Sequence, residues 1–348
     1  MNEQLLESLT QAPGISGHEG AVRKIVIDEI KSLVDDVRID AMGNVIATRR
    51  GNGGPRIMLA AHMDEIGFLV KYIDDRGFIR FQQVGGFDPR VLVAQRVSIH
   101  TRKHGVVTGL LQPGTKPIHL LTPSDSKELK IEDLFIDLGL PGDEVKAIVT
   151  RGNMVTLHGP YQRTGNLVTS RALDDRLLVY VMIEALRIAD SKAEIVAVAT
   201  TQEEVGLRGA APAAYGVDPD VGIGLDVTLA NDIPGSPTEA TITSLGDGPA
   251  IKHFDSSQIP NPLVNEHFRE IAEREGIPYQ LEVLPRGGTD GGAIQRIRAG
   301  VPTTTLSVPT RYLHTVNESA AVTDIEHAIT LLAHFLQEAD VSRYRYTI

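Results

Sequence analysis

The chain has 348 residues, of which 42% are hydrophobic and 23% are charged, with no cysteine and a formal net charge of −11. This composition is typical of a folded protein, and it excludes disulfides, thiolate catalysis and iron–sulfur clusters. Any transition-metal site must therefore use His, Asp and Glu, and the acidic balance disfavours a nucleic-acid partner. The polar N-terminus does not resemble a secretory signal, and no stretch approaches the ~20 apolar residues of a membrane helix. We expect a cytoplasmic protein with no membrane partner.

The first half of the chain predicts two kinds of structure. Helices are expected at residues 3–11 and 20–34, and the apolar run 56–61 predicts a buried strand that ends at His62. Between residues 67 and 159, short β-rich runs alternate with turn residues. The expected strands are 68–73, 78–83, 96–100, 105–111, 144–149 and 154–158. This pattern predicts a β-barrel or β-sandwich domain at residues 68–160, inserted into another domain.

Helices and strands alternate again after residue 165. The expected helices are 173–189, 209–215, 263–275 and 326–338, and the expected strands are 194–201 and 221–227. This alternation indicates an α/β fold with a mixed, largely parallel sheet flanked by helices. We assign residues 1–67 and 161–348 to this catalytic domain.

Candidate metal ligands follow the expected strands. Ligands of open α/β sheets bind beyond the carboxyl ends of the strands, so side chains at those positions are expected to meet. Alone, each candidate has an ordinary interpretation, such as a helix N-cap for Asp174 or a solvated turn for a Glu-Glu pair. Their convergence is what indicates a site. The candidates are His62 and Asp64, Asp174, Glu203 and Glu204, Asp226, and His314.

This set of residues matches a dinuclear metal centre. Two divalent ions about 3.5–4 Å apart need a bridging carboxylate, and each ion takes further His and carboxylate ligands. The predicted roles are Asp174 as the bridge, His62 and His314 as nitrogen ligands, Glu204 and Asp226 as terminal carboxylates, and Glu203 as the base. Asp64 lies two residues after His62 and is expected to accept its free ring N–H. We expect two ions per subunit, zinc or cobalt, with manganese as an alternative.

Six motifs in this order carry a family resemblance: "AAHMDEIGFLV", "SRALDDR", "TTQEEVGLRGA", "GLDVT", "GGTDGGA" and "RYLHTVNE". They resemble the M42 family of dinuclear metallo-aminopeptidases, the tetrahedral (TET) and glutamyl aminopeptidases, over nearly the whole chain. The resemblance implies one metal on His62, Asp174 and Asp226 and another on Asp174, Glu204 and His314. It also implies that Glu203 is the general base, with Asp64 orienting the site. The inserted domain would then build a homo-oligomer, expected to be a dodecamer.

The predicted function is metal-dependent removal of the N-terminal residue from peptides. Glu203 would take a proton from the metal-activated water and deliver it to the leaving amine. Gly288, Thr289 and Asp290 are expected to line the substrate pocket, although an ordinary turn is an equally good interpretation of this loop.

Three alternatives stay open at this point. A deacylase or carboxypeptidase with the same metal centre is the nearest, because Arg208, Arg286 or Arg311 is available to hold a substrate carboxylate. A glucanase is less favoured, since glycoside hydrolysis usually uses two metal-free carboxylates. A binding or assembly protein with a vestigial site is the third.

Overall fold

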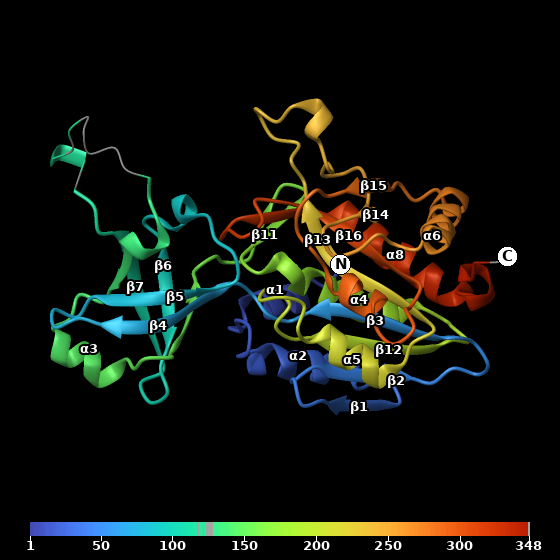
Figure 1. Cartoon of the computed structure of the whole chain (residues 1–348), viewed down its shortest axis with the longest axis horizontal. Coiled ribbons are helices and arrows are strands. Elements are labelled where there is room, and N and C mark those ends of the chain that lie inside the picture. The colour runs from blue at the N-terminus through green and yellow to red at the C-terminus, as the bar shows by residue number, and fades with distance from the viewer. Residues whose placement is uncertain (117, 121, 123–127, 347–348) are drawn as a thin grey trace.

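The computed structural model describes residues 1–116, 118–120, 122 and 128–346. Two bodies lie side by side along the long axis of the molecule (Figure 1). One is built on an eleven-stranded sheet and the other is a closed barrel of strands in the order β4-β5-β8-β7-β6-β9. This arrangement confirms the predicted α/β fold with a β-barrel as its second part.

Four neighbouring strands form the parallel centre of the large sheet. They are β12 (Glu194–Thr200), β3 (Arg56–His62), β13 (Val221–Leu229) and β16 (Thr303–Arg311). Because parallel strands end at the same edge, the residues that follow all four meet there. Strands in antiparallel pairs extend the sheet on both sides. These are β1 (Asp36–Ile39), β2 (Val45–Arg49), β10 (Gln162–Thr164), β11 (Leu167–Ser170) and β17 (Glu318–Ala321). From β16 the sheet also branches to β14 (Ala250–Phe254), which pairs antiparallel with β16 and parallel with β15 (Gln280–Val283).

Helices cover both faces of the sheet. Successive residues of a strand point to opposite faces, so Ile57 and Leu59 pack into one core, whereas Met58 and Ala60 pack into another. The first core contains residues of α1 (Glu3–Gln11), α2 (Gly20–Ile30), α4 (Leu173–Ile188), α6 (Pro262–Glu275) and α8 (Val322–Glu338). The second contains residues of α5 (Ala210–Val217) and α7 (Asp290–Gln295).

The barrel has a hydrophobic core of its own, which includes Phe68, Ile99 and Ile136. Closure pairs the last strand with the first and leaves no sheet edge free. Its strands are β4 (Gly67–Ile73), β5 (Ile79–Val84), β6 (Arg96–His100), β7 (Val106–Pro113), β8 (Leu134–Asp137) and β9 (Met154–Leu157). The division of the chain into domains at residues 68 and 160 stays a prediction.

One predicted barrel strand is wrong. Residues 144–148 belong to helix α3 (Gly142–Ile148) and Val149 is its C-cap, and the barrel takes β8 from an earlier segment instead. Acidic residues in the first turn and Lys146 in the last match the helix dipole, and buried Val145 and Val149 are spaced one helical turn apart. The 3-10 helices are η1 (Pro89–Leu92), η2 (Ile118–Leu120), η4 (Ile131–Asp133), η5 (Thr238–Ala240) and η6 (Val341–Tyr344).

The other predicted elements hold with small changes at their ends. Helix α2 ends at Ile30, four residues earlier than expected, whereas α8 begins at Val322, four residues earlier than expected. Across the described ranges, no helix combines the length and the apolar character needed to cross a membrane. The expected cytoplasmic location stays a prediction.

Candidate metal centre

A cavity of about 570 Å³ opens at the carboxyl ends of the four central strands. Each predicted ligand lines this cavity, although the five segments that carry them are far apart in the sequence. Strand order explains this convergence, because β12, β3, β13 and β16 are consecutive neighbours in the sheet. The wall contains the predicted residues His62, Asp174, Glu203, Glu204, Asp226 and His314.

The Asp174 carboxylate lies between the two predicted histidine ligands. Its Oδ1 is 3.1 Å from His62 Nε2, and its Oδ2 is 3.4 Å from His314 Nε2. Glu204 Oε2 lies 3.5 Å from the same His314 nitrogen. One oxygen therefore faces each imidazole, which is the placement expected of a carboxylate shared by two ions.

Asp175 also reaches this site, although the sequence analysis left it out. Two groups of three side chains bring ligand atoms within 4.8 Å of one another, namely His62 with Asp175 and Asp226, and His62 with Asp174 and Glu204. Asp175 Oδ2 accepts the His62 backbone N–H at 3.1 Å. Asp175 Oδ1 and Glu204 Oε1 are buried without a hydrogen-bond partner among the described residues. Nitrogen and oxygen donors with unpaired buried oxygens fit bound divalent cations.

The segment that carries Asp174 differs from the regular helix start that was expected. Helix α4 begins at Leu173, but Asp174 and Asp175 have non-helical backbone angles, and the peptide between them is cis. Ala172 occupies the N-cap position of α4, so a helix N-cap is not the role of Asp174. Its N–H is instead donated to Glu318 Oε2 at 3.1 Å.

Glu318 is a second residue that the sequence analysis missed. It is 2% exposed, and its Oε1 accepts the backbone N–H of His314 at 2.9 Å. The same carboxylate thus contacts the backbone of two predicted ligands. Its signal in the sequence is the acidic residue four positions after His314 in "HTVNE".

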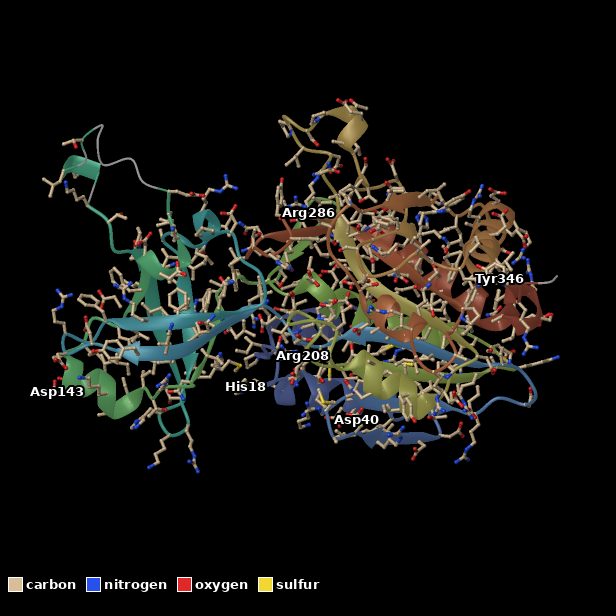
Figure 2. All side chains as sticks on the ribbon, in the orientation of Figure 1. His18, Asp40, Asp143, Arg208, Arg286 and Tyr346 are labelled. Atoms are coloured by element: carbon tan, nitrogen blue, oxygen red, sulfur yellow. The ribbon has the colours of Figure 1, made fainter. Side chains whose placement is uncertain are left out.

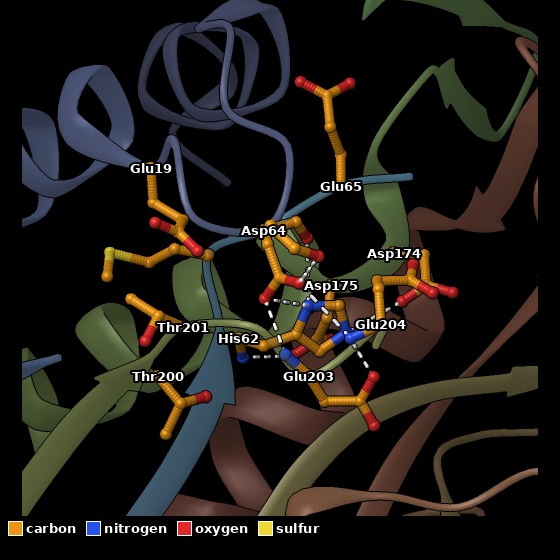
Figure 3. A network of polar contacts seen from close by, with 12 residues as sticks. Glu19, His62, Asp64, Glu65, Asp174, Asp175, Thr200, Thr201, Glu203 and Glu204 are labelled. Carbon is orange, nitrogen blue, oxygen red and sulfur yellow. Dashed lines mark hydrogen bonds and ion pairs between the residues drawn. The ribbon is translucent and has the colours of Figure 1, made fainter. Parts of the chain in front are cut away.

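Asp64 supports the site differently from the expectation. His62 Nδ1 lies 2.9 Å from the backbone carbonyl of Asp64 and 3.5 Å from its Oδ1, so the carbonyl is the closer acceptor. The Asp64 carboxylate accepts the N–H groups of Glu203 at 3.0 Å and Glu204 at 3.2 Å (Figure 3). It also accepts the Ser16 hydroxyl at 2.6 Å. Asp64 therefore positions the Glu-Glu pair as well as His62.

Burial dominates the electrostatics of the acidic side chains. It raises the pKa of Glu204 to about 8 and raises the pKa values of Glu203 and Asp226 well above their ordinary range. Burial alone would lower the pKa of His314, but the charge of Glu204 and the hydrogen bond with Asp174 raise it to about 10. The cavity thus disfavours uncompensated negative charge and favours a cation among its carboxylates.

The predicted substrate loop is divided between the cavity and the core. Gly288 and Thr289 line the cavity. Asp290 is 3% exposed and accepts a hydrogen bond from the Thr200 hydroxyl at the end of β12, and it is not among the lining residues. We therefore place Asp290 behind the wall, at the first residue of α7.

The three candidate arginines have different surroundings. Arg286 lines the cavity and is labelled in Figure 2. Arg311 pairs with Asp232 at 2.6 Å, so its guanidinium is already engaged. Arg208 is exposed and is not a lining residue. Arg286 is the arginine available to a ligand in the cavity.

Lys252 is a further wall residue that the sequence analysis did not single out. It is fully buried on β14, forms an ion pair with Glu282 and lies 3.6 Å from Asp255. These two carboxylates compensate its charge, which burial would otherwise disfavour. A lysine inside the apolar strand "AIKHF" was its signal in the sequence.

Fold and site together define a class of protein. A mixed α/β sheet carries two imidazoles and several buried carboxylates at the carboxyl ends of its parallel strands, inside a cavity large enough for part of a peptide. This combination is that of a metal-dependent hydrolase.

The chain belongs to the M42 peptidase family. The family described as M42 glutamyl aminopeptidase matches residues 43–331. A putative aminopeptidase of Acetivibrio thermocellus is 41% identical over 94% of this chain and 96% of its own. The predicted family and enzyme class are confirmed, and the protein is a metal-dependent aminopeptidase.

Solved structures agree with this assignment. An aminopeptidase of the archaeon Desulfurococcus kamchatkensis is 39% identical, with a TM-score of 0.94 over 98% of this chain and 96% of that one. The TET1 peptidase of Pyrococcus horikoshii, which can assemble into a tetrahedron or a large octahedral shell, is 34% identical. Its TM-score is 0.85 over 97% of this chain and 99% of that one.

Proposed function

We propose that the cavity holds two divalent ions, zinc or cobalt, and that the enzyme uses them to remove the N-terminal residue of peptides. One ion would be held by His62, Asp174 and Asp226, and the other by Asp174, Glu204 and His314. The observation that supports this assignment is the Asp174 carboxylate, which directs one oxygen toward each imidazole. Asp175 lies beside the first set.

Bound divalent ions would polarise the scissile carbonyl and lower the pKa of a water molecule. Glu203 lines the cavity, and its Oε2 lies 3.9 Å from His62 Nε2. Its raised pKa suits a group that accepts a proton from water and then donates it to the leaving amine. Asp64 accepts the backbone N–H of Glu203 and so holds the main chain from which this side chain enters the cavity.

The substrate would occupy the part of the cavity beyond the predicted ligands. Its wall there mixes apolar side chains with polar ones such as Thr289, with the cationic Lys252 and Arg286, and with the backbone of Gly288. The free α-amine of a peptide would find the acidic side of the cavity, which explains a preference for the N-terminal residue. The apolar wall residues are Leu207, Val227, Leu229, Leu284 and Leu313.

Self-association into a homo-oligomer, which we propose to be a dodecamer, would enclose these cavities. The barrel exposes large apolar side chains that a monomer would leave in water, among them Tyr72 and Val106, which are 59% and 61% exposed. The shells formed by the TET1 relative support this proposal. Mass measurement by light scattering would contradict it if the metal-loaded protein behaved as a monomer.

A substrate panel tests the proposed chemistry. The panel contains leucyl-p-nitroanilide, its N-acetylated form, and a dipeptide that is unblocked or N-acetylated, each with a free or amidated C-terminus. Every substrate is assayed after chelation and after addition of zinc, cobalt or manganese. We expect metal-dependent cleavage of unblocked substrates only, with metal analysis giving two ions per chain. Cleavage of the N-acetylated dipeptide that requires its free C-terminus would instead favour the carboxypeptidase alternative, with Arg286 as the carboxylate partner.

A further inference from the structure

We propose that Glu318 is a positioning residue that sets the spacing between Asp174 and His314, and thereby the metal affinity of the centre. This inference rests on the proposed ligand roles of those two residues. Glu318 does not line the main cavity, so it is placed to act through its neighbours and not on a substrate.

The backbone around Glu318 explains why a side chain is needed there. Strand β17 lies between β11 and β16, with Glu318 opposite Ser170 and Ser319 opposite Arg311. The chain leaves both neighbouring strands at these points, and Asp174 and His314 come a few residues later. Strand pairing therefore ends just before the two ligands.

The Glu318 carboxylate bridges this gap. Oε1 accepts the His314 N–H at 2.9 Å, and Oε2 accepts the Asp174 N–H at 3.1 Å. Both segments need such support, because Ala172 and His314 have φ angles of +55° and +61°, a region that residues with a Cβ rarely adopt. One buried side chain thus ties together two irregular segments that carry neighbouring ligands.

Only a carboxylate can accept from both N–H groups. Glutamine has nearly the same shape but offers one acceptor oxygen, and its NH₂ group would face the other N–H donor. The Asp174 Oδ2 and His314 Nε2 atoms are 3.4 Å apart, so a small shift of either segment changes the space left for an ion. Loss of a hydrogen-bonding partner behind metal ligands commonly weakens metal binding roughly tenfold to hundredfold.

Asp324 provides a matched control within the same chain. It is also fully buried, and its two oxygens accept the N–H groups of Gly246 at 2.8 Å and Gly248 at 3.0 Å. This geometry repeats that of Glu318, but Asp324 lies near the start of α8 and does not line the cavity. General destabilisation should affect Glu318→Gln and Asp324→Asn alike.

The experiment compares metal binding by wild type, Glu318→Gln and Asp324→Asn in the full-length protein. Zinc affinity is measured by competition with a chromophoric chelator, and the cobalt-loaded proteins are compared by their visible spectra. We expect both variants to melt at a lower temperature. Only Glu318→Gln should bind zinc roughly tenfold or more weakly, change the cobalt spectrum, and lower kcat at saturating metal with little change in KM.

Two further variants separate the possible failures. Glu318→Asp keeps two acceptor oxygens on a shorter side chain, so it should fold and show a zinc affinity between those of wild type and Glu318→Gln. If Glu318→Gln does not fold, the comparison uses Glu318→Asp in its place. Metal binding by Glu318→Gln or Glu318→Asp that matches wild type would overturn the positioning role. A His314→Ala variant that keeps wild-type zinc affinity would instead refute the proposed metal centre.

Discussion

The crowded carboxylates predict that the metal-free protein loses stability as pH rises. Burial moves the pKa of Glu204 from 4.5 in the unfolded chain to about 8 in the folded protein, and its side chain is only 6% exposed. A carboxyl group with a raised folded pKa stabilises the fold fully below its unfolded pKa, and this contribution is lost as pH rises through the folded value. The pKa of His314 is also raised, to about 10, so its contribution to stability is likewise lost as pH rises above 6.5.

The magnitude follows from these shifts. Each pH unit between the unfolded and folded pKa values of one group changes the free energy of unfolding by about 1.4 kcal/mol. Between pH 4.5 and pH 7, the Glu204 carboxyl therefore lowers the free energy of unfolding of the metal-free protein by about 3 kcal/mol. Glu204→Gln removes this titration, so we expect the metal-free variant to be more stable than wild type at pH 8 and to show a weaker pH dependence.

Urea denaturation between pH 5 and 9 after chelation measures this effect. Addition of zinc should stabilise wild type most at high pH, because a cation compensates the ionised carboxylates, and should stabilise Glu204→Gln less. Asp75 is on the surface of the barrel, so Asp75→Asn offers a control that removes one carboxylate without altering the cavity. A metal-free wild type whose stability is constant, or rises, from pH 5 to 8 would refute the argument.

Two further predictions concern catalysis and stability. Glu203→Gln should lower kcat by about 10²–10⁴ while the zinc content stays at the wild-type level, and near-normal turnover would exclude Glu203 as the base. Arg176→Met should lower the free energy of unfolding by about 3–5 kcal/mol in urea, because Arg176 is fully buried and donates to Glu65 and to several backbone carbonyls. The exposed Arg90→Met should leave the urea midpoint unchanged, and an equal effect of both variants would contradict this explanation.

Much of the site is readable in the sequence because strand ends are local signals. An apolar run followed by His62, or by Glu203 and Glu204, marks a buried strand that delivers polar groups at its end. Asp226 differs slightly, since β13 continues to Leu229 and this predicted ligand lies within the strand. Its neighbours Ile223 and Leu225 are buried apolar residues of the same strand, which accounts for the burial of Asp226.

Other features depend on contacts between distant segments. The helical identity of residues 142–148 was missed because a run of six residues with two valines fits a strand as well as a helix. Asp175 was missed because the local pattern does not distinguish it from the neighbouring Asp174, and Glu318 because its spacing from His314 does not by itself separate a buried acid from a surface one. Their burial arises only when β17, β11 and β16 pair and carry their loops to one edge.

The sequence by itself thus determined the composition of the centre: a cysteine-free chain restricts a metal site to His, Asp and Glu, and local patterns show where each candidate follows a strand. Tertiary structure alone decided which of these groups share a cavity, how Asp174 divides its oxygens between two imidazoles, and which side chains hold the ligands from behind. The physical reason is that strand order and the direction of a carboxylate are set by packing and hydrogen bonds between segments far apart in the chain, which no local pattern encodes.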